Sequence, residues 1–185
     1  MLLPSHFESK SNLTHIDLRN NRLEKLPDQL CDLILLREIR LDYNFLRHLP
    51  YGLSRLQHLQ FLSVSQNLLK TVPRRLFHRK SQLEYLHLND NKLTQIPQRI
   101  GNLTSLKSLL LHNNFIFEIP ASLNKISALQ EFSLDWFIYL HQEANQSDER
   151  GTKTISLPNQ IKIMKGITKS KTHLKVNTGD EEEKH

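Results

Sequence analysis

The stretch "LEYLHLNDNKLTQIP", residues 83–97, identifies the architecture because its spacing recurs along the chain. In this copy leucines occupy positions one, four and six, an asparagine occupies position nine, and an aliphatic residue and a proline close the stretch. Further copies begin at Leu13, Leu36, Leu59 and Leu106, so that successive starts lie 23, 23, 24 and 23 residues apart. A sixth copy begins at Leu129 and has Phe137 where asparagine is expected. A fixed period of this length predicts a solenoid of stacked repeats.

The apolar spacing inside each copy predicts the structure of one repeat. Alternation of apolar and polar residues before the asparagine indicates a short strand with one buried face. After each proline, apolar residues lie three apart, as in Leu30 and Leu33 or Leu53 and Leu56, which suits a turn of helix or 3₁₀ helix. One repeat cannot bury its own apolar face, so stacking is required. We therefore predict an α/β solenoid of about six repeats, with a parallel sheet on the concave face and short helical or 3₁₀ segments on the convex face.

The recurring asparagine is predicted to be structural. Where the chain turns out of a strand, backbone groups lose their sheet partners, and a short amide side chain can both donate to them and accept from them. We expect a partnered, buried role rather than a binding role for all five. They are Asn21, Asn44, Asn67, Asn91 and Asn114.

The pattern LxxLxLxxNxLxxLPxxLxxL resembles the leucine-rich repeat family, over residues 3 to about 140. The 23-residue form with Leu-Pro after the strand is similar to the intracellular subgroup that includes the Ras suppressor protein, the Scribble-type scaffolds and the Ras-binding region of yeast adenylyl cyclase. This resemblance implies a right-handed solenoid, an asparagine ladder between repeats, and a module that presents its concave face to another protein in signalling or polarity complexes. Small GTPases are partners suggested by the resemblance alone.

The chain is predicted to divide into three parts. Residues 1–140 form the solenoid, in which 1–12 match the second half of a preceding repeat and the apolar run 136–140 closes the core. Residues 141–165 are either an insertion with a degenerate terminal repeat, or a flexible tail that matches the pattern by chance. Residues 166–185 are lysine-rich and then acidic, and we expect them to be disordered.

The single cysteine favours a cytoplasmic protein, with the nucleus as the alternative. One cysteine, Cys31, cannot form an internal disulfide, whereas secreted proteins of the resembled family usually carry disulfide-bonded caps. The N-terminus has no long apolar segment. Three N-x-[ST] triplets, at Asn12, Asn102 and Asn145, are attributed to chance, since two of them precede leucines that the repeat needs.

In each strand, buried positions alternate with positions that we expect to be exposed. The candidate binding residues lie at these exposed positions. Adjacent repeats place these positions in columns, so Phe61 and Tyr85 should be direct neighbours, with other candidates close by. Exposed aromatic residues and arginine in a concavity are typical anchors of protein interfaces; single exposed apolar residues are the alternative explanation. The candidate set is Arg40, Tyr43, Phe61, Tyr85, His87, Leu110 and His112.

The histidines within this set raise two further hypotheses. His112 and Asp135 share a column one strand apart, so an ion pair that raises the pKa of the histidine is one expectation. A metal site formed by His87, His112 and Asp135 is the other, and it is disfavoured because strand diagonals are long for a shared zinc ion. No metal is predicted.

A basic ridge is predicted on the edge or convex side of the solenoid. The net charge is +6, and no Asp or Glu occurs from Tyr43 to Leu83. This charge raises nucleic acid or anionic lipid as alternative partners, but the run lacks the interleaved aromatic residues that stack on bases. An acidic protein partner, or solubility alone, fits better, and the C-terminal lysines add at most weak membrane attraction. The ridge consists of Lys70, Arg74, Arg75, Arg79 and Lys80.

Nothing in the sequence indicates catalysis. Five glycines and no phosphate-binding Gly-rich loop argue against a nucleotide site, no HExxH motif is present, and Cys31 fits a packing position. We therefore predict no catalytic residue and no cofactor. The sequence favours a non-enzymatic scaffold that binds a protein through its concave face, with a place in intracellular signalling as the expectation. Electrostatic binding through the basic ridge is the alternative.

Overall fold

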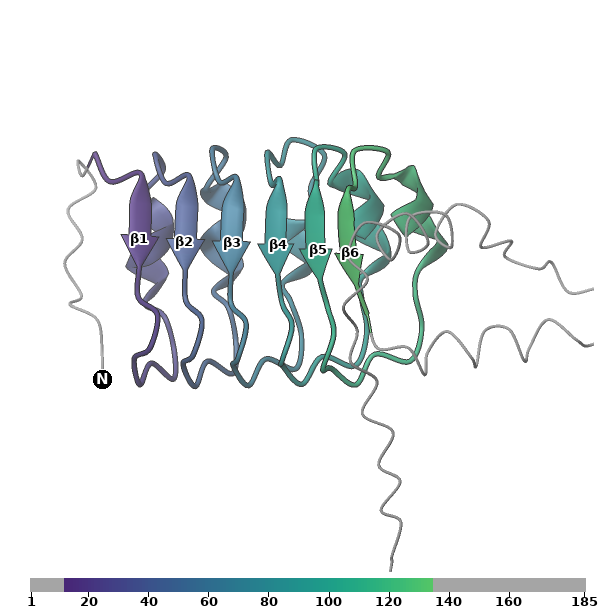
Figure 1. Cartoon of the computed structure of the whole chain (residues 1–185). Helices are drawn as coiled ribbons and strands as arrows, with labels where there is room; N and C mark the ends of the chain where they lie inside the picture. The colour runs from purple at the N-terminus through teal and green to yellow at the C-terminus, as the bar shows by residue number, and fades with distance from the viewer. Residues whose placement is uncertain (1–11, 135–185) are drawn as a thin grey trace, which may run out of the picture.

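The computed structural model describes residues 12–134 as one six-stranded parallel sheet, with strands in the order of the sequence. Figure 1 shows the strands side by side, with the 3₁₀ segments in a second layer behind them. The predicted α/β solenoid is confirmed. The strands are β1 (His15–Asp17), β2 (Glu38–Arg40), β3 (Phe61–Ser63), β4 (Tyr85–His87), β5 (Ser108–Leu110) and β6 (Glu131–Ser133).

The strand register follows the predicted columns. His15 pairs with Glu38, Glu38 with Phe61, and Phe61 with Tyr85, and the same column continues to β6. The register is fixed because a shift of one residue would turn every buried leucine to the solvent.

A proline precedes each 3₁₀ segment, and its restricted φ begins the turn. In the first repeat the N–H of Leu30 donates to the carbonyl of Pro27 at 3.1 Å, which is the i to i+3 bond of a 3₁₀ helix. The same bond recurs in all five segments. They are η1 (Asp28–Asp32), η2 (Tyr51–Arg55), η3 (Arg74–Leu76), η4 (Gln98–Asn102) and η5 (Ala121–Lys125).

Between the two layers lies one continuous apolar core. Leu36, Ile39 and Leu62, from neighbouring repeats, are fully buried. The first coil is less covered by the described residues, since Leu13 is 43% exposed. Stability therefore depends on stacking between coils rather than on any coil alone.

The third repeat departs from the others in its 3₁₀ segment. Its proline is followed by Leu76 and Phe77, and Arg79 occupies the place where the other repeats have a second buried aliphatic residue. Phe77, two positions earlier, is 1% exposed and belongs to the apolar core. Its carbonyl accepts a bond of 3.1 Å from the side chain of Asn102 in the next repeat. In this repeat η3 is three residues long, whereas the other 3₁₀ segments have five, and the step to the next repeat is 24 residues.

The repeated asparagines connect each coil to the one before it. The Oδ1 atom of Asn67 accepts from the N–H of Leu46 at 2.9 Å, and its Nδ2 atom donates to the carbonyl of Leu41 at 3.0 Å, both in the preceding coil. The same amide also donates to carbonyls in its own coil. Asn44, Asn91 and Asn114 make the equivalent bonds. Asn21 differs, because within residues 12–134 its side chain bonds only to its own coil.

The outer parts of the predicted domain scheme lie outside the described residues. This applies to the half repeat before residue 12, the closing segment 136–140, the insertion or terminal repeat at 141–165, and the tail at 166–185. Those boundaries remain predictions. Within 12–134, no helix has the length and apolar character needed to span a membrane.

Replacing Asn67 by alanine is expected to lower the free energy of unfolding by about 2–4 kcal/mol, because one buried N–H and several carbonyls lose their partner. Asn21→Ala is the matched control and is expected to cost about 1 kcal/mol or less, since the bonds described for Asn21 do not join two coils. Urea denaturation followed by circular dichroism measures both. Equal losses in the two variants would show that the bonds between coils carry no extra stability.

Candidate functional site

The concave face carries a cluster of ring and cationic side chains centred on Phe61. The guanidinium carbon of Arg40 lies 4.7 Å from the centroid of the Phe61 ring. The rings of Tyr85 and His87 lie 5.7 Å and 5.2 Å from Phe61, tilted by 35° and 75°. We call these four residues the aromatic cluster. They come from β2, β3 and β4, and the parallel register brings them together.

The contacts within the aromatic cluster are themselves favourable. Offset or edge-to-face ring pairs and an arginine over a ring each contribute roughly 0.5–1.5 kcal/mol. Tyr85 is 37% exposed, and Phe61, Arg40 and His87 are partly buried, so the cluster is held in place while one side remains open to solvent. Side chains that are already ordered lose less entropy when a partner binds.

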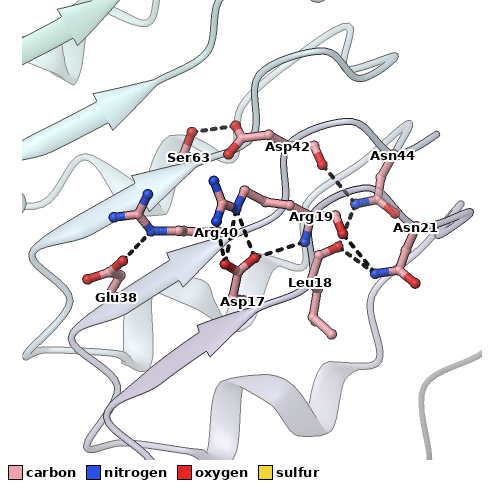
Figure 2. A network of polar contacts seen from close by, with 9 residues as sticks. All are labelled: Asp17, Leu18, Arg19, Asn21, Glu38, Arg40, Asp42, Asn44 and Ser63. Atoms are coloured by element: carbon pink, nitrogen blue, oxygen red, sulfur yellow. Dashed lines mark hydrogen bonds and ion pairs between the residues drawn. The ribbon is translucent and has the colours of Figure 1, made fainter.

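An ion pair within β2 orients Arg40. Its Nε atom donates to the carboxylate of Glu38, as Figure 2 shows, while its guanidinium lies over Phe61. In the preceding repeat, Arg19 donates to the carboxylate of Asp17 at 2.7 Å, and these bonds lower the pKa of Asp17 to about 2. The end of the concave face at β1 and β2 is therefore charged, and the middle is aromatic.

A polar chain runs from His87 to β6. The Nε2 atom of His87 lies 3.2 Å from the hydroxyl of Ser108, which donates to Glu131 at 2.7 Å. Because the Ser108 hydroxyl hydrogen points to Glu131, the geometry favours the tautomer of His87 that carries hydrogen on Nε2. Burial lowers the pKa of His87, and the charges of Glu131 and Asp42 oppose that shift only in part. His87 is therefore favoured as a neutral ring.

The expectation that all alternating strand positions are exposed was wrong for three short residues. Ser63 and Ser108 are 4% and 2% exposed, and Asp42, which follows β2, is also buried. The carboxylate of Asp42 accepts from the hydroxyl of Ser63 and from the N–H of Ser65, as Figure 2 shows for the first of these. The polar groups of these short side chains are bonded to neighbouring residues, and the accessible concave surface comes from larger side chains.

The remaining candidates do not belong to the aromatic cluster. Leu110 pairs with His87 across β4 and β5 and is partly buried. The Nδ1 atom of His112 lies 2.7 Å from the hydroxyl of Ser133, and its Nε2 atom lies 4.0 Å from Asp90. The partner predicted for His112, Asp135, lies outside the described residues. Within residues 12–134, no group of three or more potential ligands could hold a metal ion.

Tyr43 lies in a turn and has a backbone conformation that was not predicted from the sequence. The residue before each of the five repeated asparagines has a positive φ, and at Tyr43 the angle is 58°. The equivalent residues are Asn20, Gln66, Asp90 and Asn113. A tyrosine in this left-handed region is unusual, because its Cβ atom crowds the following carbonyl. Its side chain is 59% exposed in the turn that follows β2.

The basic ridge lies apart from the aromatic cluster. Arg74 and Arg75 belong to η3, in the layer opposite the sheet, and all five ridge residues are exposed. Among residues 12–134, no carboxylate lies within 4.0 Å of a ridge cation, whereas Arg55 and Lys107 each have an acidic partner. Over the described part of the chain, the ridge is thus a surface of unneutralised positive charge.

Comparison with known proteins assigns the family. Residues 16–149 match the family model described as a leucine-rich repeat region, which is more than half of the chain. The chain belongs to the leucine-rich repeat family. Its 32% identity to human oligodendrocyte-myelin glycoprotein covers 67% of this chain and 33% of that protein. Chicken (Gallus gallus) lumican is 36% identical over 63% of this chain and 35% of its own length. The mouse leucine-rich repeat and calponin homology domain-containing protein 1 is 34% identical over 54% of this chain and 14% of its own length.

Solved leucine-rich repeat structures also match. The PEPR1-AtPEP1 crystal structure gives a TM-score of 0.65 at 28% identity, over 72% of this chain and 19% of that chain. The ectodomain of the Arabidopsis thaliana receptor kinase GASSHO1/SCHENGEN3, in complex with CASPARIAN STRIP INTEGRITY FACTOR 2, gives 0.62 at 32% identity, over 66% of this chain and 15% of that chain. This chain therefore spans about a third or less of most of these leucine-rich repeat proteins.

Replacing Tyr43 by asparagine is expected to raise the free energy of unfolding by about 1 kcal/mol, because asparagine tolerates a positive φ better than tyrosine does. Tyr51→Asn, at an exposed tyrosine without a positive φ, is the control and should change stability by no more than about 0.5 kcal/mol. Urea denaturation measures both. No gain in Tyr43→Asn would mean that the ring of Tyr43 makes a compensating contribution.

The stability of the protein should fall as the pH drops below 6.5, in part through His87. The unfolded histidine takes up a proton near its ordinary pKa of 6.5, whereas the folded ring, with a lowered pKa, resists protonation. His87→Gln removes this contribution, so its stability relative to wild type should rise on acidification. Urea denaturation at several pH values measures the difference, and a difference that does not vary with pH would contradict the lowered pKa.

Proposed function

We propose that this chain is a non-enzymatic protein-binding module that binds a protein partner through its concave face. The observation that carries the proposal is the aromatic cluster, in which Arg40, Tyr85 and His87 each contact the ring of Phe61. Partly exposed aromatic residues and arginine, held in place by neighbours, have the properties of interface anchors. Leu110, Tyr43 and His112 extend the same surface.

The similarity to the GASSHO1/SCHENGEN3 ectodomain supports a recognition role, because that leucine-rich repeat structure is a complex with CASPARIAN STRIP INTEGRITY FACTOR 2. That this chain has a protein partner, and that the partner binds its concave face, are both part of our proposal. We further propose a place in intracellular signalling, with small GTPases as the first class of partner to test, on the resemblance of the 23-residue repeat to the Ras suppressor and Scribble-type group.

A cytoplasmic location belongs to the same proposal. The side-chain amide of Asn102, which lies in one of the three N-x-[ST] triplets, is partly buried and donates to the carbonyl of Phe77. A glycan on that nitrogen would disturb this bond. Cys31 is buried, and burial raises the pKa of its thiol to about 11, which suits a packing role. Fractionation of cells that express the tagged chain tests the location.

Electrostatic binding of nucleic acid or anionic lipid through the basic ridge is the alternative. The exposed ridge cations, which have no carboxylate within 4.0 Å among the described residues, favour it. It differs from the main proposal in two measurable ways, since it depends on salt and does not depend on the aromatic cluster.

The double variant Phe61→Ala with Tyr85→Ala is expected to abolish retention of a protein partner in affinity capture from cytosol, because it removes the centre of the aromatic cluster. Truncation of a central anchor commonly costs about 2 kcal/mol or more in binding. Mass spectrometry identifies the retained proteins, and circular dichroism checks the fold of each variant.

The matched control is Tyr51→Ala with Phe117→Ala, which removes one tyrosine and one phenylalanine that are 76% and 70% exposed and do not belong to the aromatic cluster. This control variant should still retain a partner that binds to the concave face. Loss of capture in the control and not in the first variant would overturn the concave-face proposal. Retention of an anionic ligand by both variants, with release by modest salt, would favour the basic ridge instead.

A further inference from the structure

A second recessed surface lies away from the concave face. A groove of about 740 Å³ runs across four successive repeats, along the residues at which their 3₁₀ segments begin. Its lining includes the aliphatic residue before the proline in three of them, Leu49, Val72 and Ile96, all buried. Exposed aromatic residues from the first and last of these repeats, Tyr51 and Phe117, also belong to the lining.

The irregular third repeat explains why a groove forms here. Val72 is the smallest residue at its position, where the other repeats have leucine or isoleucine, so its side chain occupies less volume. In the same repeat η3 is three residues long, whereas the other 3₁₀ segments have five. Segment η2 packs against both η1 and η3, and η4 packs against η5. Of the neighbouring pairs, η3 and η4 pack least closely. The convex layer therefore opens beside Val72 and Pro73.

The charge of the groove is predominantly positive. Arg74 and Arg75 contribute to its lining, and neither has a carboxylate within 4.0 Å among residues 12–134. Lys70, Arg79 and Lys80 of the basic ridge are close in sequence, and Glu118 is the acidic residue in the lining. Uncompensated cations beside an apolar floor raise the local concentration of anionic groups and guide their approach.

We infer that this groove binds a short, extended acidic segment of a partner protein. Neighbouring repeats lie about 4.8 Å apart, so four repeats span roughly 15 Å, the length of four or five residues of extended chain. The side chains of an extended segment alternate in direction, so aliphatic ones meet Leu49, Val72 and Ile96 while carboxylates face Arg74 and Arg75. The rings of Tyr51 and Phe117 contact the flanking residues.

The observations favour a peptide over nucleic acid as the occupant. The two lining arginines are adjacent in η3, and a nucleic acid strand needs cations distributed along its backbone. The aromatic side chains of Tyr51 and Phe117 come from repeats at opposite ends of the groove, so they do not provide a platform for successive bases. The aliphatic floor instead suits the side chains of a peptide.

Selection from a random-peptide library displayed on phage tests this inference with the full chain. The library is selected on wild type after depletion on the variant Arg74→Glu with Arg75→Glu. Both arginines are exposed, so the fold should persist, and circular dichroism checks it. We expect recovered peptides to combine Asp or Glu with aliphatic residues, and to lose about tenfold or more in affinity for the depletion variant, because like charges then face each other.

Two further variants locate the site. Tyr51→Ala with Phe117→Ala should also weaken the selected peptides. Arg79→Glu with Lys80→Glu makes the same change in net charge at ridge residues that do not line the groove, and it should affect binding much less. The variant Phe61→Ala with Tyr85→Ala should leave peptide binding unchanged, which separates this test from that of the concave face.

Several outcomes would overturn the inference. Recovery of no peptide, or of peptides that are not acidic, would exclude it. Equal losses in the Arg74/Arg75 and Arg79/Lys80 variants would mean that the peptides respond to overall charge and not to the groove. A single-stranded oligonucleotide that displaces the peptides at lower concentration would identify a nucleic acid site. If peptides bind only after Asp180, Glu181, Glu182 and Glu183 are changed to the corresponding amides, the occupant is the chain's own acidic segment and not a partner protein.

Discussion

The hydrogen bonds of the ladder asparagines are the constraint that organises the whole solenoid. Each of Asn44, Asn67, Asn91 and Asn114 bonds to backbone groups of its own coil and of the coil before it. The turn after each strand would otherwise leave buried N–H and carbonyl groups without partners, at a cost of about 1–3 kcal/mol for each group. One side chain therefore closes a turn and joins two repeats, and this holds the strands in a constant register.

The constant register has a direct consequence for the concave face. A residue at one position of a strand always lies beside the residue at the same position in the next strand, so a surface is formed from residues about 23 positions apart in the sequence. Phe61 meets Tyr85 for this reason, and Arg40 reaches the Phe61 ring from the strand on the other side. The proposed binding surface is thus a property of the stack, and no single repeat contains it.

The 3₁₀ layer is less uniform than the sheet, and this difference produces the second surface. The sheet is held by backbone bonds that are the same in every repeat, whereas the 3₁₀ segments pack through side chains that differ between repeats. The third repeat has a phenylalanine at residue 77, a valine at residue 72 and a shorter η3, while its strand β3 keeps the same register with both neighbours. An irregular repeat can therefore open a groove on one side of the solenoid while the aromatic cluster on the other side stays intact.

The fold class, the strand positions, the register and the neighbouring placement of Phe61 and Tyr85 could all be predicted from the amino-acid sequence, because they follow from a strict period and from the requirement to bury leucines. The accessible positions on the concave face could not, as the burial of Ser63 and Ser108 shows. The same is true of the stacking of Arg40 on Phe61, the positive φ of Tyr43 and the groove beside Val72. The physical reason is that periodicity fixes where a backbone lies, whereas accessibility, side-chain contacts and cavities depend on the relative sizes of neighbours from different repeats.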